Sequence, residues 1–223
     1  MSDIEPTNIE EIKKADGIES THPPAAELLK MEGSMLGLAA SPSEPVKADC
    51  HTNFKAYHKS GTRPTGQIWW IVMHDTEGGT AQGVALYFSG SNSGGSAHLV
   101  VDDNACYRCL DNNEIPWGAP GANYHGFHIE QCGFAKWSRT IWSKTHRKQL
   151  MRAAYKTAFH CAKFNIPVIF VTAPDLKKNK PGITTHLECT RAFGGSHVDP
   201  GPGWPKWLFM QLTKTYYRQL TKV

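Results

Sequence analysis

Short apolar segments separated by glycines and polar turns predict a series of β-strands. The most hydrophobic of them, residues 68–73, is apolar on both faces, which is typical of a strand buried in the middle of a sheet. Two further segments, 97–102 and 105–110, flank a polar Asp-Asn pair and predict a hairpin. Additional strands are predicted at residues 126–132 and 166–171.

Helical periodicity is clearest over residues 145–164, where apolar side chains recur at the spacing of one helix face. A shorter helix is predicted at 80–88, with Thr80 as its N-cap, and a closing helix at 204–220. Strands mixed with long helices predict an α/β fold. We expect a single layered domain with a central mixed β-sheet flanked by helices.

Residues 1–48 predict a poorly ordered acidic arm in front of this domain. A short helix is expected at 9–15, a Pro-Pro pair prevents its continuation, and the segment that follows has the composition of a linker. The folded domain would then span residues 49–223. Whether the arm is a simple linker or a targeting or docking segment is open at this point.

Charge is distributed unevenly along the chain. The net charge is +4, but the first 49 residues carry ten acidic and four basic side chains, whereas the rest carries ten acidic and twenty basic ones. A cationic body favours polyanionic partners such as nucleic acid, phosphorylated wall polymers or anionic membrane surfaces. The basic residues are not interleaved with aromatic ones in a nucleic-acid-binding motif, so nucleic acid is not expected as a partner.

Neither a membrane span nor a secretory signal is apparent in the sequence. No apolar run reaches the roughly 18 to 20 residues that a span needs, so no membrane insertion is expected. The start of the chain is acidic and lacks the basic region and apolar core of a signal peptide. We therefore expect synthesis in the cytoplasm, with release by another protein if the chain acts outside the cell.

Six cysteines in a chain of 223 residues do not define a disulfide scaffold. Cys106 and Cys109 form a single C-x2-C pair, whereas a structural zinc site would normally need a second one. Both are therefore predicted to be small apolar residues on a strand.

Two histidines and one aspartate form a candidate metal site. His74 follows the apolar run at 68–73 and leads into a loop, while His186 and Asp199 lie in a loop-rich stretch near the C-terminus. A catalytic Zn²⁺ commonly has three protein ligands and one position for water. The set therefore predicts a zinc hydrolase, with Cys189 as the main rival ligand.

Four short motifs occur in an order that resembles the zinc-dependent N-acetylmuramoyl-L-alanine amidases of type 2. This family includes bacteriophage endolysins, wall-recycling enzymes and peptidoglycan recognition proteins. The resemblance covers roughly residues 67–212. The motifs are Val72-Met73-His74-Asp75-Thr76, Ser96-Ala97-His98-Leu99-Val100-Val101, His128-Ile129-Glu130 and His197-Val198-Asp199-Pro200-Gly201.

The resemblance implies a role for each matching residue. It makes His74, His186 and Asp199 the zinc ligands and Glu130 the general base. Other branches use a tyrosine where this chain has Ala97, which leaves the acid–base work to Glu130. His197 stands where the family has a lysine and would donate a hydrogen bond or proton to the developing oxyanion.

The loop before the catalytic strand departs from the family pattern. Many relatives have Trp-His-Ala-Gly where this chain has Trp117-Gly118-Ala119-Pro120, so one loop imidazole is missing. Trp117, Tyr124 and His98 are candidate substrate contacts, although His98 also fits a core position. His125 and His128 are predicted to be surface or groove residues.

The resemblance implies a peptidoglycan hydrolase that cleaves the amide between the lactyl group of N-acetylmuramic acid and L-alanine. A monomeric phage endolysin is expected, reaching the wall from the host cytoplasm through holin-type release. Two alternatives remain: a host enzyme that recycles muropeptides, and a recognition module that binds peptidoglycan without cutting it.

Overall fold

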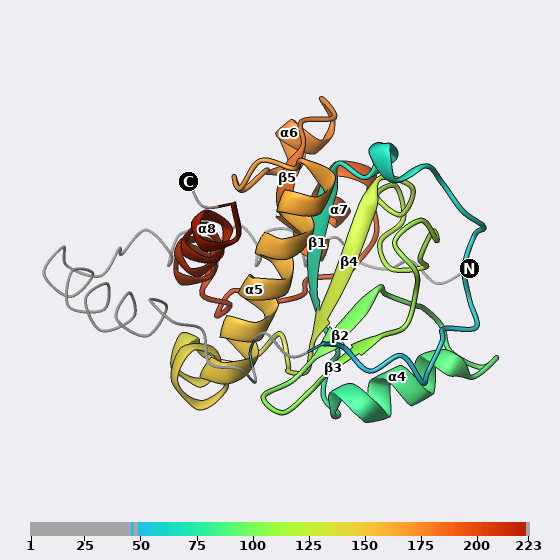
Figure 1. Ribbon diagram of the computed structural model, residues 1–223, viewed down its shortest axis with the longest axis horizontal. Helices are drawn as coiled ribbons and strands as arrows, with labels where there is room; N and C mark the ends of the chain where they lie inside the picture. The colour runs from blue at the N-terminus through green and yellow to red at the C-terminus, as the bar shows by residue number, and fades with distance from the viewer. Residues whose placement is uncertain (1–45, 47–48, 222–223) are drawn as a thin grey trace, which may run out of the picture. The chain divides into compact units, whose positions relative to one another are not determined.

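Five β-strands form one sheet in the order β3-β2-β4-β1-β5 (Figure 1). They are seen in a computed structural model that describes Val46 and residues 49–221. Apart from Val46, the expected arm at 1–48, with its predicted helix, lies outside the described residues. The strands are β1 (Trp70–Asp75), β2 (Leu99–Val101), β3 (Cys106–Arg108), β4 (Gly126–Gln131) and β5 (Gly182–Thr185).

The sheet is mixed, as the sequence predicts. Strand β1 pairs in parallel with both β4 and β5, and β2 pairs in parallel with β4. Only the edge strand β3 is antiparallel, because it forms the predicted hairpin with β2. The parallel pairing brings the carboxyl ends of β1, β4 and β5 to the same edge of the sheet, where ligands of α/β folds commonly bind.

Helices cover both faces of the sheet. No helix in the described part of the chain is long and apolar enough to cross a bilayer. Two short turns, η1 (Thr65–Gln67) and the π-helical η2 (Ile141–Thr145), accompany the longer helices. The α-helices are α4 (Ala81–Ser89), α5 (Arg147–Phe164), α6 (Ala173–Leu176), α7 (His186–Phe193) and α8 (Lys206–Thr221).

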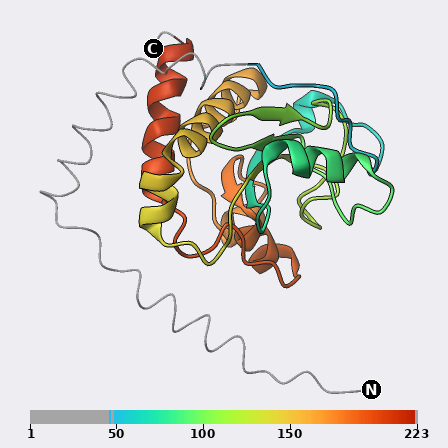
Figure 2. The same cartoon turned by 90° about the horizontal axis from the view of Figure 1, so that it is seen from below.

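Helix α5 packs on one face of the sheet, with α8 on its outer side (Figures 1 and 2). Met73 of β1 contacts Thr157 of α5, with 3.6 Å between sulfur and hydroxyl oxygen. Phe127 of β4 stacks on His160 of α5 at 4.1 Å between ring centroids. Side chains alternate between the two faces along a strand. The residues next to Met73 on β1 and next to Phe127 on β4 therefore face away from α5.

The opposite face is covered at its two sides by α4 and α7. Val100 of β2 packs against Ala85 and Phe88 of α4. Trp70 and Val72 of β1 belong to a buried cluster with Cys189 of α7. At the carboxyl ends of the central strands, His74 and Asp75 of β1 and Glu130 of β4 line a cleft, and this is where the site lies.

Two predicted helix boundaries show how local sequence sets the elements. Thr80 caps α4 as expected, because its hydroxyl accepts a hydrogen bond from the backbone N–H of Gly83 at 3.1 Å. Helix α5 begins at Arg147 rather than 145, since the π-helical turn precedes it. Its end is set by Asn165, which adopts a left-handed conformation (φ 56°).

The predicted strand at 166–171 is wrong. Within this segment only Phe170 makes an isolated bridge, to Ile183. The edge strand is β5 instead. Its sequence, Gly-Ile-Thr-Thr, has only one apolar side chain and therefore does not predict a buried strand. Both threonines are buried, and each hydroxyl has a partner: Thr184 donates to the carbonyl of Val171 at 3.0 Å, and Thr185 accepts from the N–H of Glu188 at 3.4 Å.

Cys106 lies on a strand as predicted, in β3, but it is not simply a small apolar residue, because it forms a disulfide with Cys50. The bond holds the segment around His51 against the sheet edge, where the backbone N–H of His51 donates to the carbonyl of Cys106 at 2.8 Å. Cys109 is a free, fully buried thiol, as predicted for a small apolar residue.

Candidate metal centre and active site

Parallel strand pairing places two histidines side by side. Met73 of β1 is in register with Thr185 of β5, so His74 and His186 are the next residues along each strand direction. Thr185 ends β5 and caps α7, accepting a hydrogen bond from the N–H of Glu188 at 3.4 Å. The Thr-His-Leu-Glu sequence therefore turns the chain from strand into helix and fixes the start of the helix at His186.

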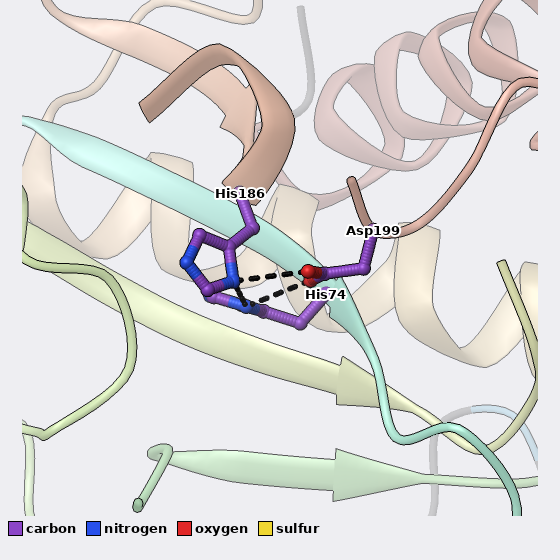
Figure 3. Close-up of side chains that lie close together, drawn as sticks. All are labelled: His74, His186 and Asp199. Atoms are coloured by element: carbon purple, nitrogen blue, oxygen red, sulfur yellow. Dashed lines mark hydrogen bonds and ion pairs between the residues drawn. The ribbon is translucent and has the colours of Figure 1, made fainter. Parts of the chain in front are cut away.

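Asp199 completes the cluster from the loop between α7 and α8. Its carbonyl accepts a hydrogen bond from the N–H of Leu187 at 3.0 Å, which ties this loop to the first turn of α7. The three side chains point toward one another in Figure 3. The Nδ1 atoms of His74 and His186 are 3.1 Å apart, and they lie 3.2 and 3.1 Å from the Asp199 carboxylate oxygens.

These distances fit a zinc ion. Zinc–nitrogen bonds of about 2.0–2.1 Å in a tetrahedron place neighbouring ligand atoms about 3.3 Å apart. The three candidate ligand atoms lie within 4.8 Å of one another on buried side chains. Oδ2 of Asp199 makes no hydrogen bond within the described structure, although it is in ion-pair range of His74. A buried carboxylate with spare acceptor capacity beside two imidazoles suits a divalent cation.

The protonation states also suit metal binding. Burial lowers the pKa of His186, which favours the neutral imidazole that a metal requires. Burial opposes ionisation of Asp199, but its ion-pair contacts with His186 and His74 outweigh this effect, so the Asp199 pKa lies below its usual range. The cluster therefore presents lone pairs and a negative charge together.

Glu130 lies beside this cluster because it is in register with His74 across the β1–β4 pairing. Its side chain is buried, and Oε2 has no hydrogen-bond partner among the described residues. Burial, with the nearby carboxyls of Asp199 and Asp75, raises the pKa of Glu130 well above its ordinary value. Such a carboxyl is suited to taking up a proton.

Asp75 is a second buried carboxyl that the sequence did not single out. It follows His74 directly, and its Oδ1 accepts a hydrogen bond from the N–H of Glu77 at 2.9 Å. Burial raises the pKa of Asp75 to about 7 despite this bond, and the negative charge of Asp199 contributes to the rise.

A cleft of about 540 Å³ opens over the cluster. The cleft gives a substrate access to both the candidate ligands and Glu130. Residues from α4, from the loop before β2 and from the loop before β4 line its outer walls. The lining residues are Ser60, His74, Asp75, Phe88, Gly94, Gly95, Ser96, Trp117, Gly118, Pro120, Asn123, Glu130, His186, His197 and Asp199.

His197 lies at the mouth of the cleft. Its ring stacks on His186 at 4.1 Å between centroids, and its Nδ1 is 3.5 Å from the Asp199 carboxylate. The side chain is 61% exposed, so it is within reach of a bound substrate.

The three predicted substrate contacts lie in different places relative to the cleft. Trp117 lines the cleft, stacks on His58 and donates its indole N–H to the Ser60 hydroxyl at 2.7 Å. Tyr124 is exposed but does not line the cleft. His98 as a substrate contact is wrong: it is fully buried and bonded through Nε2 to the carbonyl of Glu114, as expected of the alternative core position.

His128 lies elsewhere than the sequence predicts. Instead of a surface or groove residue it is fully buried, and its Nδ1 lies 2.9 Å from Nε2 of His74. It occupies the same face of β4 as Glu130, two residues away, which is the one signal that could have revealed it. His125 is half-buried and stacks on Trp69 at 3.6 Å.

The rival ligand Cys189 is not part of the cluster. Its thiol is buried among Trp70 and Val72, and burial raises its pKa to about 12, which disfavours the thiolate that metals bind. The candidate donor set therefore consists of two imidazoles and one carboxylate.

Several solved structures share this fold. The Staphylococcus aureus hydrolase AmiA in complex with its ligand aligns with a TM-score of 0.61 and 16% identity, over 79% of this chain and 87% of that one. A mutant of PlyL aligns with a TM-score of 0.55 and 17% identity, covering 75% and 99% of the two chains. An AmpD derivative aligns with a TM-score of 0.53 and 17% identity, covering 74% and 94%.

A family model provides the assignment that these low identities do not. No curated protein matches the sequence. The model described as N-acetylmuramoyl-L-alanine amidase matches residues 64–202, which include β1, β4, β5 and all three members of the candidate metal cluster. The chain therefore belongs to the N-acetylmuramoyl-L-alanine amidase family.

Proposed function

We propose that this protein is a zinc-dependent hydrolase that cleaves the amide between the lactyl group of N-acetylmuramic acid and the L-alanine of the stem peptide. The observation that carries the proposal is the convergence of His74, His186 and Asp199 at zinc-ligand separations beside Glu130, in a chain of the amidase family. A recognition module without activity would not need this complete set.

An amide resists hydrolysis because its carbonyl is a weak electrophile and its amine is a poor leaving group. Zinc in such a site makes water acidic enough to react near neutral pH and polarises the carbonyl. His74, His186 and Asp199 would hold the ion, each through the atoms that already face one another.

Glu130 would move the proton. Its Oε2, which lacks a hydrogen-bond partner in the described structure, takes a proton from the attacking water and delivers it to the departing amine. Burial and the two neighbouring carboxyls raise its pKa, whereas a cation held beside it would lower it again. These opposing influences bring the pKa of Glu130 closer to the range in which its carboxyl can both accept and release a proton.

His197 would stabilise the negative charge that develops on the carbonyl oxygen. It is positioned by its stacking on His186 and remains exposed at the mouth of the cleft. A donor directed at such an oxyanion typically contributes about 3–4 kcal/mol to lowering the barrier.

Digestion of purified cell walls tests the activity. We expect release of stem peptides that begin with a free L-alanine amine and leave the glycan uncut, identified by mass spectrometry. Chelator should abolish the release and added zinc should restore it. Binding to walls without any release would instead support the non-cutting recognition module.

We further propose that the biological role is that of a phage endolysin, made in the host cytoplasm and admitted to the wall by a holin-type protein. The cationic main body favours adsorption to an anionic wall. Lysis assays on permeabilised bacteria, compared with turnover of soluble muropeptides, separate this role from recycling: faster turnover of the soluble substrates, without lysis, would assign the enzyme to recycling.

A further inference from the structure

The imidazole of His74 has two nitrogens with separate partners. Its Nδ1 faces His186 and Asp199, while its Nε2 lies 2.9 Å from Nδ1 of His128. If Nδ1 supplies a lone pair to a metal, the hydrogen of neutral His74 must be on Nε2. His128 Nδ1 is then the acceptor for that hydrogen.

We propose that His128 is a positioning residue that fixes the tautomer and the ring orientation of His74 for metal binding. The inference rests on the proposed function only in requiring that His74 binds a metal. Ligand histidines generally donate their second N–H to a carboxylate, a carbonyl or water, and this partner orients the ring. Here a second imidazole takes that place.

His128 can fill this role because its ring is held in one place. The ring is fully buried. Its backbone is fixed as well, since the N–H of His128 donates to Nδ1 of His98 at 3.0 Å. His98 is in turn held by the carbonyl of Glu114.

Two glycines make the room that the His128 ring occupies. A Cβ at Gly118 would lie 2.4 Å from Nδ1 of His128, and a Cβ at Gly126 would lie 2.4 Å from its Nε2. Any larger side chain at either glycine would therefore displace the imidazole from its place beside His74.

The hydrogen bonding of His128 is unequal at its two nitrogens. With Nδ1 accepting from His74, Nε2 carries the hydrogen, and it has no acceptor among the described residues. A buried donor without an acceptor is energetically unfavourable. An apolar ring could fill the same space without an unpartnered donor. The presence of an imidazole therefore indicates that Nδ1 is needed as an acceptor for His74.

Zinc affinity, measured by chelator competition, tests the inference. His128→Ala should raise the zinc Kd about 10- to 100-fold, the usual effect of losing a partner that orients a ligand. His128→Asn, whose Oδ1 can replace the Nδ1 acceptor, should restore affinity to within about threefold of the wild type. His160→Asn, which removes another buried imidazole far from the cluster, is the matched control and should leave the Kd unchanged.

Histidine nitrogen NMR of the zinc-loaded protein provides a second readout. The wild type should show His74 protonated at Nε2, and the signal should shift in His128→Ala. Gly118→Ala should weaken zinc binding in the wild type, because its methyl group displaces His128, yet add nothing in the His128→Ala background.

Two results would overturn the inference. One is an unchanged zinc Kd in His128→Ala. The other is equal loss of affinity in His128→Asn and His128→Ala, accompanied by an equal drop in the melting temperature of the metal-free protein, which would mean that the ring only supports the fold. Absence of zinc binding in the wild type would instead reject the proposed function, and the inference with it.

Discussion

The carboxylates in the site differ in pKa because their immediate neighbours differ. Asp199 faces two imidazoles, which keep its pKa below the usual range. Glu130 is buried, and the two carboxyls near it raise its pKa. Environments that shift the pKa values of two carboxyls in opposite directions suit the two groups to different roles. Asp199 is fit to hold a cation, and Glu130 is fit to exchange a proton.

Asp199→Asn should remove zinc binding while preserving the shape of the side chain. We expect a loss of affinity larger than the roughly 10- to 100-fold that follows removal of an outer partner, because a charged direct ligand is lost. Metal analysis after dialysis measures it. Full zinc occupancy in Asp199→Asn would contradict the proposed ligand set.

Glu130→Gln should separate metal binding from catalysis. The amide side chain keeps the volume but cannot accept a proton, so kcat should fall about 10²- to 10⁴-fold. Zinc content should stay at the wild-type level, since Glu130 is not among the three clustered donors. Steady-state rates of stem-peptide release, paired with metal analysis, measure both. Near-normal kcat would rule out Glu130 as the base.

Among the secondary-structure elements, those with strong periodicity were predictable and the weakly patterned edge was not. The apolar run of β1, the hairpin and the long helix α5 all followed from their patterns. Strand β5 did not, because its threonines look exposed until their hydrogen bonds are known. The segment at 166–171 looks like a strand, but its apolar residues pack without a ladder.

The candidate site was predictable only as far as sequence motifs reach. His74, His186 and Asp199 were recognised from their motifs, and the fold brings them together. His128 was missed because its contact with His74 depends on the pairing of two strands far apart in sequence. Space for the His128 ring also depends on Gly118, which lies in a third segment of the chain. A local sequence pattern cannot predict contacts among three separate segments.

The disulfide between Cys50 and Cys106 is expected to stabilise the sheet edge. It closes a loop with a sequence separation of 56, for which the chain-entropy account gives about 4 kcal/mol. Replacing both cysteines by serine should lower the free energy of unfolding by about 2–5 kcal/mol in urea titrations. Reductant should destabilise the wild type to a similar extent but leave the double variant unchanged; equal sensitivity of both would argue against the bond.

Across the whole molecule, buried neutral histidines couple stability to pH. Burial lowers the pKa of His160 to about 3, and that of His98 well below its usual value. The unfolded chain takes up protons on these rings below about pH 6.5, whereas the folded chain does not. Unfolding therefore binds protons, and stability should fall as pH drops from about 6.5 toward 3.

His160→Gln should reduce this dependence. The ring of His160 donates through Nδ1 to the carbonyl of Lys156 at 2.7 Å, an interaction that requires no positive charge. Between pH 7 and pH 5 the wild type should lose about 2 kcal/mol more than the variant. Urea titrations in the presence of chelator, at both pH values, measure the difference. Parallel losses in the two proteins would show that His160 is not the titrating group.

The attachment of Asp199 to α7 has a consequence for how an ion enters and leaves. One donor stands on β1, the second begins α7 directly after β5, and the third is tethered by the backbone bond from Leu187, so the backbone fixes the location of all three. Zinc should accordingly be exchangeable for cobalt under native conditions, with no unfolding step. The coloured cobalt form would then allow the coordination sphere to be followed spectroscopically during turnover.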